Sequence, residues 1–281
     1  MRLLYLTLFV VYLQSAFGAT HNLTLRFQPN TLQLVDSNML PIVSIADTNT
    51  VHPFLGKFNL NDSLVLKVIN ADTLSHNFTI ENYVNSSLIN SYDSSYFYLK
   101  LNKEGTFIIF DGGVFPNNQY SSISGLLAIE QTNIKTYYWN VREFQSEWHQ
   151  DTFIRAMNPL LYYPDYFTVN NLSNPNVDSH ADSRVAGSVG DTIHLVIANT
   201  GLSIHSMHFH GYHLKILNSS KHPETIGRSK DTFPLYPMEV LKLELIPDKP
   251  GVYPVHDHNL IGVTGGMFYP NGMFTTLRIV P

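Results

Sequence analysis

The chain contains two copies of one sequence pattern, and this repeat constrains the fold more than any other feature. The stretch Asn61–His76 matches Gly190–His205 at one constant offset and without a gap. Further on, Gly105–Asp111 matches Gly251–Asp257 at a larger offset. The second copy therefore carries an insertion, which we place around Ser219–Asp231. Such a repeat indicates two domains of the same fold.

Both copies have the pattern of β-structure. Short runs of β-branched and aromatic residues alternate with Gly, Pro, Asn and Asp, and helical periodicity is scarce. The clearest runs are Leu64–Ile69, Thr106–Phe110, His194–Ile197 and Val240–Leu245. The chain has no cysteine, so its hydrophobic core must stabilise it without disulfides. We therefore expect an all-β protein of two tandem Greek-key β-sandwich domains, residues 19–131 and 132–281.

The first 18 residues are typical of a secretory signal peptide. A basic start is followed by the apolar run Leu3–Leu13 and by Ala16-Phe17-Gly18, which suits a cleavage site. No later run reaches the roughly 20 apolar residues that a membrane span needs. Six Asn-x-Ser/Thr sequons are candidate glycosylation sites: Asn22, Asn61, Asn77, Asn85, Asn171 and Asn218. We expect a secreted, extracellular glycoprotein.

The net charge of −5, without a basic block, gives no support for nucleic-acid binding. The histidines instead indicate a metal ion as the partner. His208 and His210 are separated by one residue, and so are His256 and His258. Side chains two apart share one face of a strand, so paired strands would bring four imidazoles together at roughly 5 Å. Imidazole suits copper(II), and zinc(II) accepts the same ligands.

The same segment resembles the multicopper oxidase family. The stretch His205-Ser-Met-His208-Phe-His210-Gly211 resembles the family motif His-x-x-His-x-His-Gly, and the stretch ending in His256-Asp257-His258 resembles the closing Gly-x-x-x-x-His-Cys-His. Tyr137–Phe144 also resembles the start of the second domain in that family and in two-domain nitrite reductases. The resemblance covers most of the chain and implies two cupredoxin (plastocyanin-like) domains. It also implies a type 1 copper ligand at His205, cluster ligands at the other histidines, and Met267 at the axial position.

Several positions depart from the family pattern. Asp257 replaces the cysteine, and Gly262 stands where the second type 1 histidine belongs. A blue copper site needs that thiolate, so we expect the type 1 site to be degenerate. The first copy has no histidine at the positions of the four cluster ligands, where it carries Thr79, Glu81, Phe110 and Gly112. The expected metal ligands are therefore His208, His210, His256 and His258, with His205, Asp257 and Met267 as weaker candidates.

Three functions remain open at this point. The first is a secreted protein that binds copper, or zinc, through the paired His-x-His motifs. The second is a copper-dependent oxidoreductase that uses this site directly or completes a cluster with another chain across a homo-oligomer interface. The sequence identifies no catalytic residue for it. The third is an interaction protein that kept the sandwich and lost the metal. Copper content separates the third from the others, and oxygen consumption separates the first two.

Overall fold

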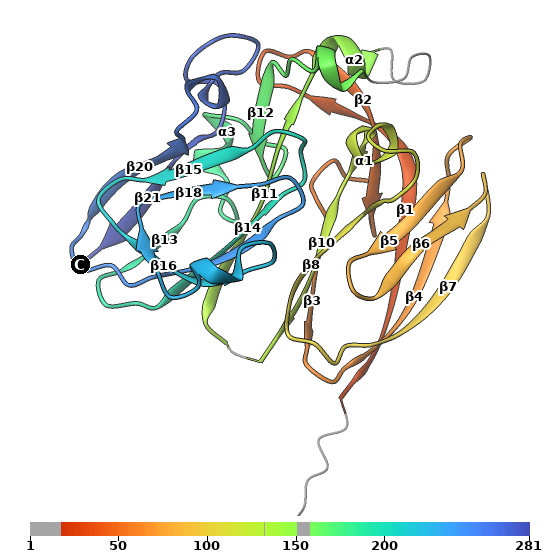
Figure 1. Cartoon of the computed structure of the whole chain (residues 1–281), viewed down its shortest axis with the longest axis horizontal. Coiled ribbons are helices and arrows are strands. Elements are labelled where there is room, and N and C mark those ends of the chain that lie inside the picture. The colour runs from red at the N-terminus through yellow and green to blue at the C-terminus, as the bar shows by residue number, and fades with distance from the viewer. Residues whose placement is uncertain (1–17, 132, 151–157) are drawn as a thin grey trace, which may run out of the picture.

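The structure is a computed structural model that describes residues 18–281 except residue 132 and residues 151–157. The predicted signal peptide lies outside the described residues apart from Gly18. Figure 1 shows two β-sandwiches side by side, the first from red to yellow-green and the second from green to blue. Among the described residues, no helix is long and apolar enough to cross a membrane. The predicted all-β architecture is therefore confirmed.

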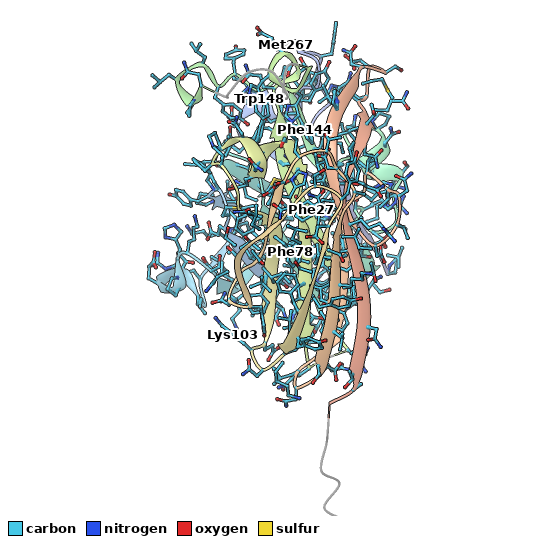
Figure 2. All side chains as sticks on the ribbon, turned by 90° about the vertical axis from the view of Figure 1, so that its right-hand side faces the viewer. Phe27, Phe78, Lys103, Phe144, Trp148 and Met267 are labelled. Atoms are coloured by element: carbon cyan, nitrogen blue, oxygen red, sulfur yellow. The ribbon has the colours of Figure 1, made fainter. Side chains whose placement is uncertain are left out.

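The first sandwich consists of two five-stranded sheets. One sheet has the strand order β7 (Ser94–Lys100), β4 (Ser63–Asn70), β1 (Thr20–Gln33), β2 (Met39–Ala46), β9 (Ser122–Ile123). The other has the order β3 (Leu55–Asn59), β10 (Gly125–Glu130), β8 (Gly105–Asp111), β5 (His76–Ile80), β6 (Val84–Ile89). Figure 2 places Phe27 and Phe78 in the middle of this sandwich, where their rings meet edge to face at 6.1 Å.

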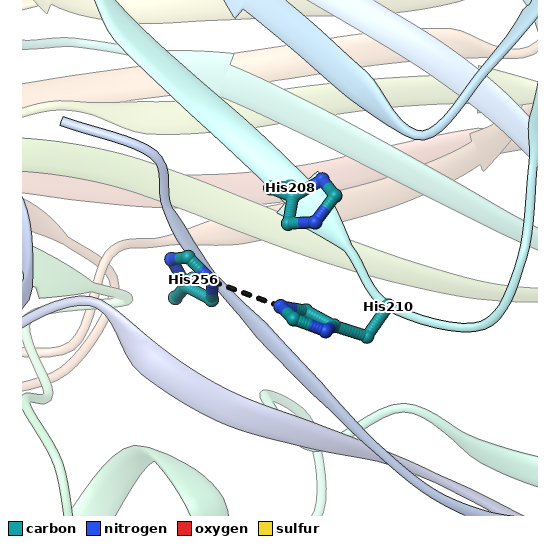
Figure 3. A group of neighbouring side chains, drawn as sticks. All are labelled: His208, His210 and His256. Carbon is teal, nitrogen blue, oxygen red and sulfur yellow. Dashed lines mark hydrogen bonds between the residues drawn. The ribbon is translucent and has the colours of Figure 1, made fainter.

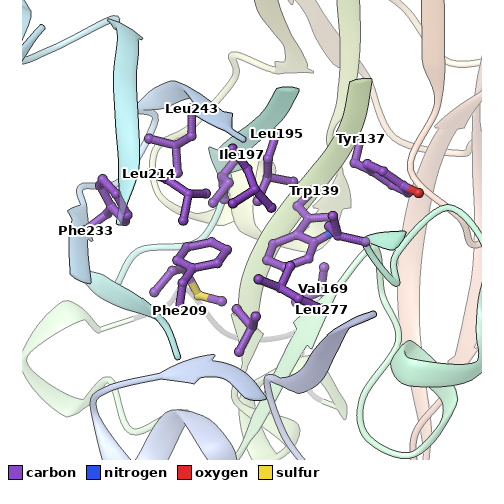
Figure 4. Packing of buried hydrophobic residues seen from close by; sticks show 14 of the residues in the cluster. Tyr137, Trp139, Val169, Leu195, Ile197, Phe209, Leu214, Phe233, Leu243 and Leu277 are labelled. Carbon is purple, nitrogen blue, oxygen red and sulfur yellow. The ribbon is translucent and has the colours of Figure 1, made fainter. Parts of the chain in front are cut away.

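The second sandwich has one six-stranded and one five-stranded sheet. The larger sheet has the order β12 (Tyr166–Val169), β11 (Lys135–Phe144), β14 (Ile193–Asn199), β19 (Val240–Leu245), β16 (Leu214–Ser219), β17 (Ser229–Lys230). The smaller has the order β13 (Ala186–Ser188), β21 (Phe274–Val280), β20 (Gly251–Asp257), β15 (His205–Phe209), β18 (Thr232–Leu235). Figure 4 shows the core between them, built around Trp139 and Phe209.

The described helices are short and lie in the connections. They are α1 (Asn117–Ser121), α2 (Ser146–Gln150), α3 (Asn176–Ser179) and the 3-10 helices η1 (Pro159–Leu161), η2 (Pro223–Thr225) and η3 (Leu260–Val263).

The two sandwiches pack on each other through the outer faces of two sheets. Ile108, Leu126 and Ala128 of the first domain form one apolar cluster with Tyr138, Val196, Ala198 and Val240 of the second. This contact explains why β14 is buried at every residue, since Leu195 and Ile197 point into their own core while Val196 and Ala198 face the other domain. A strand that is covered on both faces has a continuous run of apolar residues in its sequence.

The inserted residues of the second copy lie before the edge strand of the histidine-bearing sheet. In the first domain β6 pairs with β5 at the sheet edge, with Ile89 opposite His76. In the second domain β18 takes the same place beside β15, with Leu235 opposite His205, so β18 is the counterpart of β6 at the larger offset. The insertion therefore lies between β15 and β18 and includes β16, which pairs with β19 in the opposite sheet, so it begins before the predicted range.

Candidate metal centre

The two histidine motifs lie on neighbouring antiparallel strands, so the strand pairing on which the predicted site depends is present. His208 on β15 is the direct cross-strand partner of His256 on β20. Met207, Phe209 and Val255 alternate with them and point into the core, so the two imidazoles lie on the outer face of the sheet.

Three imidazoles converge on one space at this face. Figure 3 shows His208 and His210 on one chain segment and His256 on the other, with their rings turned toward one another. One ring nitrogen from each of the three lies within 4.8 Å of the others, and the Nε2 atoms of His210 and His256 are 3.1 Å apart. The short distance between the two Nε2 atoms is the distance expected for imidazoles that share one metal ion.

Hydrogen bonds fix which nitrogen of each ring faces this space. The Nδ1 atom of His208 lies 2.8 Å from the hydroxyl of Thr232, and Nδ1 of His256 lies 2.9 Å from the carbonyl of Asp257. Because a carbonyl only accepts, His256 carries its proton on Nδ1 and presents a bare Nε2. Thr232 in turn donates to Asp231 over 3.1 Å, so its oxygen can accept from His208 in the same way. Such outer hydrogen bonds orient metal-binding imidazoles.

The rings of the other two candidate ligands are more exposed to solvent than those of His208 and His256. His210 and His258 are exposed, and each follows the end of its strand. Partial burial and the nearby His208 and His256 lower the pKa of His210, which favours the neutral ring that a metal requires. The His258 ring centroid lies 5.4 Å from that of His208, so His258 borders the three-imidazole group without belonging to it.

His205 and Asp257 lie on the opposite, buried side of the same strands, and they form an ion triad with Glu143. Nδ1 of His205 is 2.8 Å from Asp257 and Nε2 is 2.9 Å from Glu143. All three side chains are at most 1% exposed. Both ring nitrogens are therefore occupied by carboxylates on opposite sides, and this arrangement holds a proton where the family would hold a type 1 copper.

The first domain contains the equivalent triad. Nδ1 of His76 is 2.6 Å from Asp111, and Nε2 is 2.9 Å from Asp72. The backbone N–H of the residue after each histidine also donates to the aspartate in both domains. Burial opposes the charged ring of His76, but the two carboxylates outweigh it and raise its pKa. The repeat thus preserves a buried charged histidine in each domain.

Two glycines make room for the carboxylates of the second triad. A Cβ at Gly262 would lie 2.2 Å from Oδ2 of Asp257, and one at Gly201 would lie 1.9 Å from Oε2 of Glu143. Gly201 corresponds to Asp72 in the repeat. In the second domain the carboxylate of Glu143, on β11, therefore takes the place that the Asp72 carboxylate has in the first domain. Met267 is 65% exposed at one end of the molecule, as Figure 2 shows, and does not reach the buried His205.

Sequence reasoning missed Glu143 and Thr232. Glu143 lies within the Tyr137–Phe144 stretch that carried the family resemblance, but no spacing rule links it to His205. Thr232 corresponds to Ser86 at the larger offset, but the first domain has Thr79 in place of His208, so the repeat gave no sign of this contact.

Fold and site together define a protein of two β-sandwich domains with a three-imidazole cluster in the second. Comparison with known proteins agrees with that class. A family model described as multicopper oxidase matches residues 155–271. The multicopper oxidase MmcO of Mycobacterium tuberculosis (strain ATCC 25618 / H37Rv) is 32% identical over 73 residues, which are 26% of this chain but only 14% of that relative.

Solved structures with low sequence identity share the fold over nearly the whole chain. The blue copper oxidase from Nitrosomonas europaea superposes with a TM-score of 0.81 at 21% identity, covering 92% of this chain and 86% of that one. The copper nitrite reductase from Nitrosomonas europaea gives a TM-score of 0.75 at 13% identity, covering 93% and 94%. The chain therefore has the fold of two cupredoxin-like domains, and residues 155–271 are similar to the multicopper oxidase family.

Proposed function

We propose that this is a secreted copper-binding protein whose second domain, residues 132–281, holds one copper ion through His208, His210 and His256. The observation that carries the proposal is the convergence of one nitrogen from each ring within 4.8 Å. The hydrogen bonds to Thr232 and to the Asp257 carbonyl leave Nε2 of two rings free, so the donor set fits the ion. His258 is the nearest candidate for a fourth ligand.

Copper is favoured over zinc by two arguments. Copper(II) stands at the top of the affinity order for nitrogen ligands. The relatives with matching sequence or fold are named as copper proteins. A bound copper(II) ion would supply a Lewis-acidic, one-electron redox centre. The residues of this chain would orient three imidazoles around it and leave one side open to solvent.

An oxidoreductase is the second candidate function, and the openness of the site favours it. His210 and His258 are exposed on the outer sheet face, so a small substrate or a second copy of the chain can approach the cluster. Electron delivery through a type 1 site is not available, because the chain contains no cysteine. Copper binding alone therefore needs no route for electrons to the site, whereas oxidation does. An interaction protein without metal would leave the convergence of the three imidazoles unexplained.

Metal analysis of the secreted, purified protein tests the proposal. We expect about one copper per chain in the wild type and almost none in the double variant His208→Ala/His256→Ala, because one imidazole cannot hold the ion. The matched control is His52→Ala/His222→Ala, which removes one exposed and one half-buried histidine outside the cluster and should retain copper. Equal copper content in the folded wild type and the His208/His256 variant would refute the proposal. Oxygen consumption with phenolic or metal substrates then tests for oxidase activity.

A further inference from the structure

Three segments of the second domain form an apolar surface at one end of the molecule. They are residues 158–164, 201–204 and 259–271, and Figure 2 shows Met267 of the third segment at this end. Among the described residues, these segments expose nine large apolar or aromatic side chains to at least 50% each, and Leu160 reaches 93%. These nine side chains together are the apolar patch.

The three segments are neighbours in space. Tyr163, Ile204 and Ile261 line one pocket of about 180 Å³. The third segment also lies beside the residue that follows the first, because the backbone N–H of Gly266 donates to the carbonyl of Asp165 over 2.9 Å. The patch is therefore one surface, and a large exposed apolar surface on a soluble protein marks an interaction site.

Short capped helices hold the exposed side chains in place. Asn158 caps η1, which carries Leu160 and Leu161, and Asn259 caps η3, which begins with Leu260. Each asparagine side chain accepts a hydrogen bond from a backbone N–H of its helix. An ordered surface loses little conformational freedom when a partner binds, so these side chains are prepared for contact.

The segments of the patch carry no charge. Residues 158–164, 201–204 and 259–271 contain no Asp, Glu, Lys, Arg or His, although charged residues make up 14% of the chain, and no sequon lies in them. Two copies of this negatively charged chain can therefore meet here without like-charge repulsion at the contact. A lipid surface is a weaker match, because anionic headgroups attract basic residues and these segments have none.

The area of the patch is enough for a stable dimer. Nine large side chains that are at least half exposed present on the order of 1,000 Å² of surface, since one aromatic side chain alone can bury about 150–250 Å². A specific interface needs about 800 Å² from each partner. The largest apolar patch on an ordinary monomer covers only about 300–600 Å².

The patch contains both a projection and a hollow. Leu160 projects almost completely into solvent, and the pocket between Tyr163, Ile204 and Ile261 offers room for a leucine side chain. A surface with both features can be its own partner, because each contact of a two-fold dimer occurs twice.

We propose that the apolar patch is the interface of a homodimer, in which a second copy of the chain packs on it about a two-fold axis. Leu160 of each copy enters the pocket of the other copy. The dimer forms without metal, so the inference does not rest on copper binding by the histidine cluster.

Analytical ultracentrifugation of the full secreted chain in the presence of EDTA tests the proposal. We expect a dimer at about 10 μM protein. Leu160→Glu/Leu260→Glu should weaken dimerisation at least about 100-fold, because carboxylates would be buried without partners. The matched control is Leu88→Glu/Ile246→Glu, which adds the same charge at two exposed apolar residues outside the patch. It should change the dissociation constant less than about threefold.

Three results would each overturn the proposal: a monomeric wild type at about 10 μM, equal dissociation constants of the two double variants, or a dimer that EDTA abolishes. The last result would indicate a metal ion shared between copies, since His258 lies two residues before Leu260. A monomeric wild type that sediments with phosphatidylcholine vesicles would identify a lipid surface as the partner instead. Circular dichroism checks that each variant is folded.

Discussion

His205 and Asp257 form a buried ion pair, with Nδ1 of the ring 2.8 Å from Oδ2 of the carboxylate. In the multicopper oxidase motifs that this segment resembles, these two positions are the histidine and the cysteine of the type 1 copper site. Here Glu143 closes the other side of the ring at 2.9 Å, so the histidine is charged and enclosed. The buried triad is therefore a structural element of the second domain.

The first prediction concerns stability at alkaline pH. Burial alone would lower the pKa of His205, but its hydrogen bonds to Asp257 and Glu143, together with their charges, raise it from 6.5 to about 9. The folded-state pKa thus exceeds the unfolded one, so this contribution to stability is complete below about pH 6.5 and is lost as the pH rises to about 9. We expect the free energy of unfolding to fall by up to about 3 kcal/mol over this range. His76 acts in the same direction. Denaturant unfolding at both ends of the range measures the change, and equal free energies would contradict it.

The second prediction concerns Gly262. An added Cβ would lie 2.2 Å from the Asp257 carboxylate, so Gly262→Ala should destabilise the protein by about 1–3 kcal/mol through overpacking. In an Asp257→Ala background the same substitution should cost less, because the two carboxylate atoms nearest to the added Cβ are absent and only Cβ of residue 257, at 2.8 Å, remains. A double-mutant cycle of unfolding free energies measures this coupling. Additive effects of the two substitutions would show that Gly262 does not serve to accommodate Asp257.

The third prediction concerns Thr232, the hydroxyl partner of His208. Thr232→Val removes the hydrogen bond at Nδ1 and should weaken copper binding about 10- to 100-fold, whereas Thr232→Ser should restore it. Thr79→Val is the matched control, because Thr79 occupies the position of His208 in the first domain and lies outside the cluster. Copper titration and the copper(II) electron paramagnetic resonance spectrum report the effect. An unchanged affinity and spectrum in the folded valine variant would contradict a positioning role.

The fourth prediction concerns glycosylation. Asn171 is only 5% exposed, and its side-chain amide donates a hydrogen bond to the carbonyl of Val51 in the other domain. A glycan cannot be accommodated there, so the Asn171 sequon should be unmodified. The exposed sequons are Asn22, Asn61, Asn85 and Asn218, while Asn77 is half-buried. Peptide mass spectrometry of the secreted protein checks each sequon, and a glycan on Asn171 in folded protein would contradict the packing described for it.

The fifth prediction concerns colour. The intense blue of type 1 copper arises from a copper–thiolate bond, and the chain has no cysteine. The copper-loaded protein should therefore lack a strong absorption band near about 600 nm. Visible spectroscopy decides the matter, and a strong band in that region would be incompatible with imidazole ligation.

The sequence by itself determined the two-domain β-architecture and the placement of the chemically important residues on strand faces. Strand periodicity is a local property, so the spacing of His208 and His210, and of His256 and His258, was enough to put them on one side. The two offsets of the repeat also paired His76 with His205 and Asp111 with Asp257. These predictions needed no knowledge of contacts between distant segments.

Only the tertiary structure decided what those faces contact. Glu143 reaches His205 from another strand, 62 residues away, and Thr232 reaches His208 from the neighbouring edge strand β18. The structure also left His258 outside the tightest group and exposed Met267. Hydrogen-bond partners depend on how sheets pack and which strand occupies an edge. These are long-range outcomes of burying apolar surface, and local sequence patterns do not encode them.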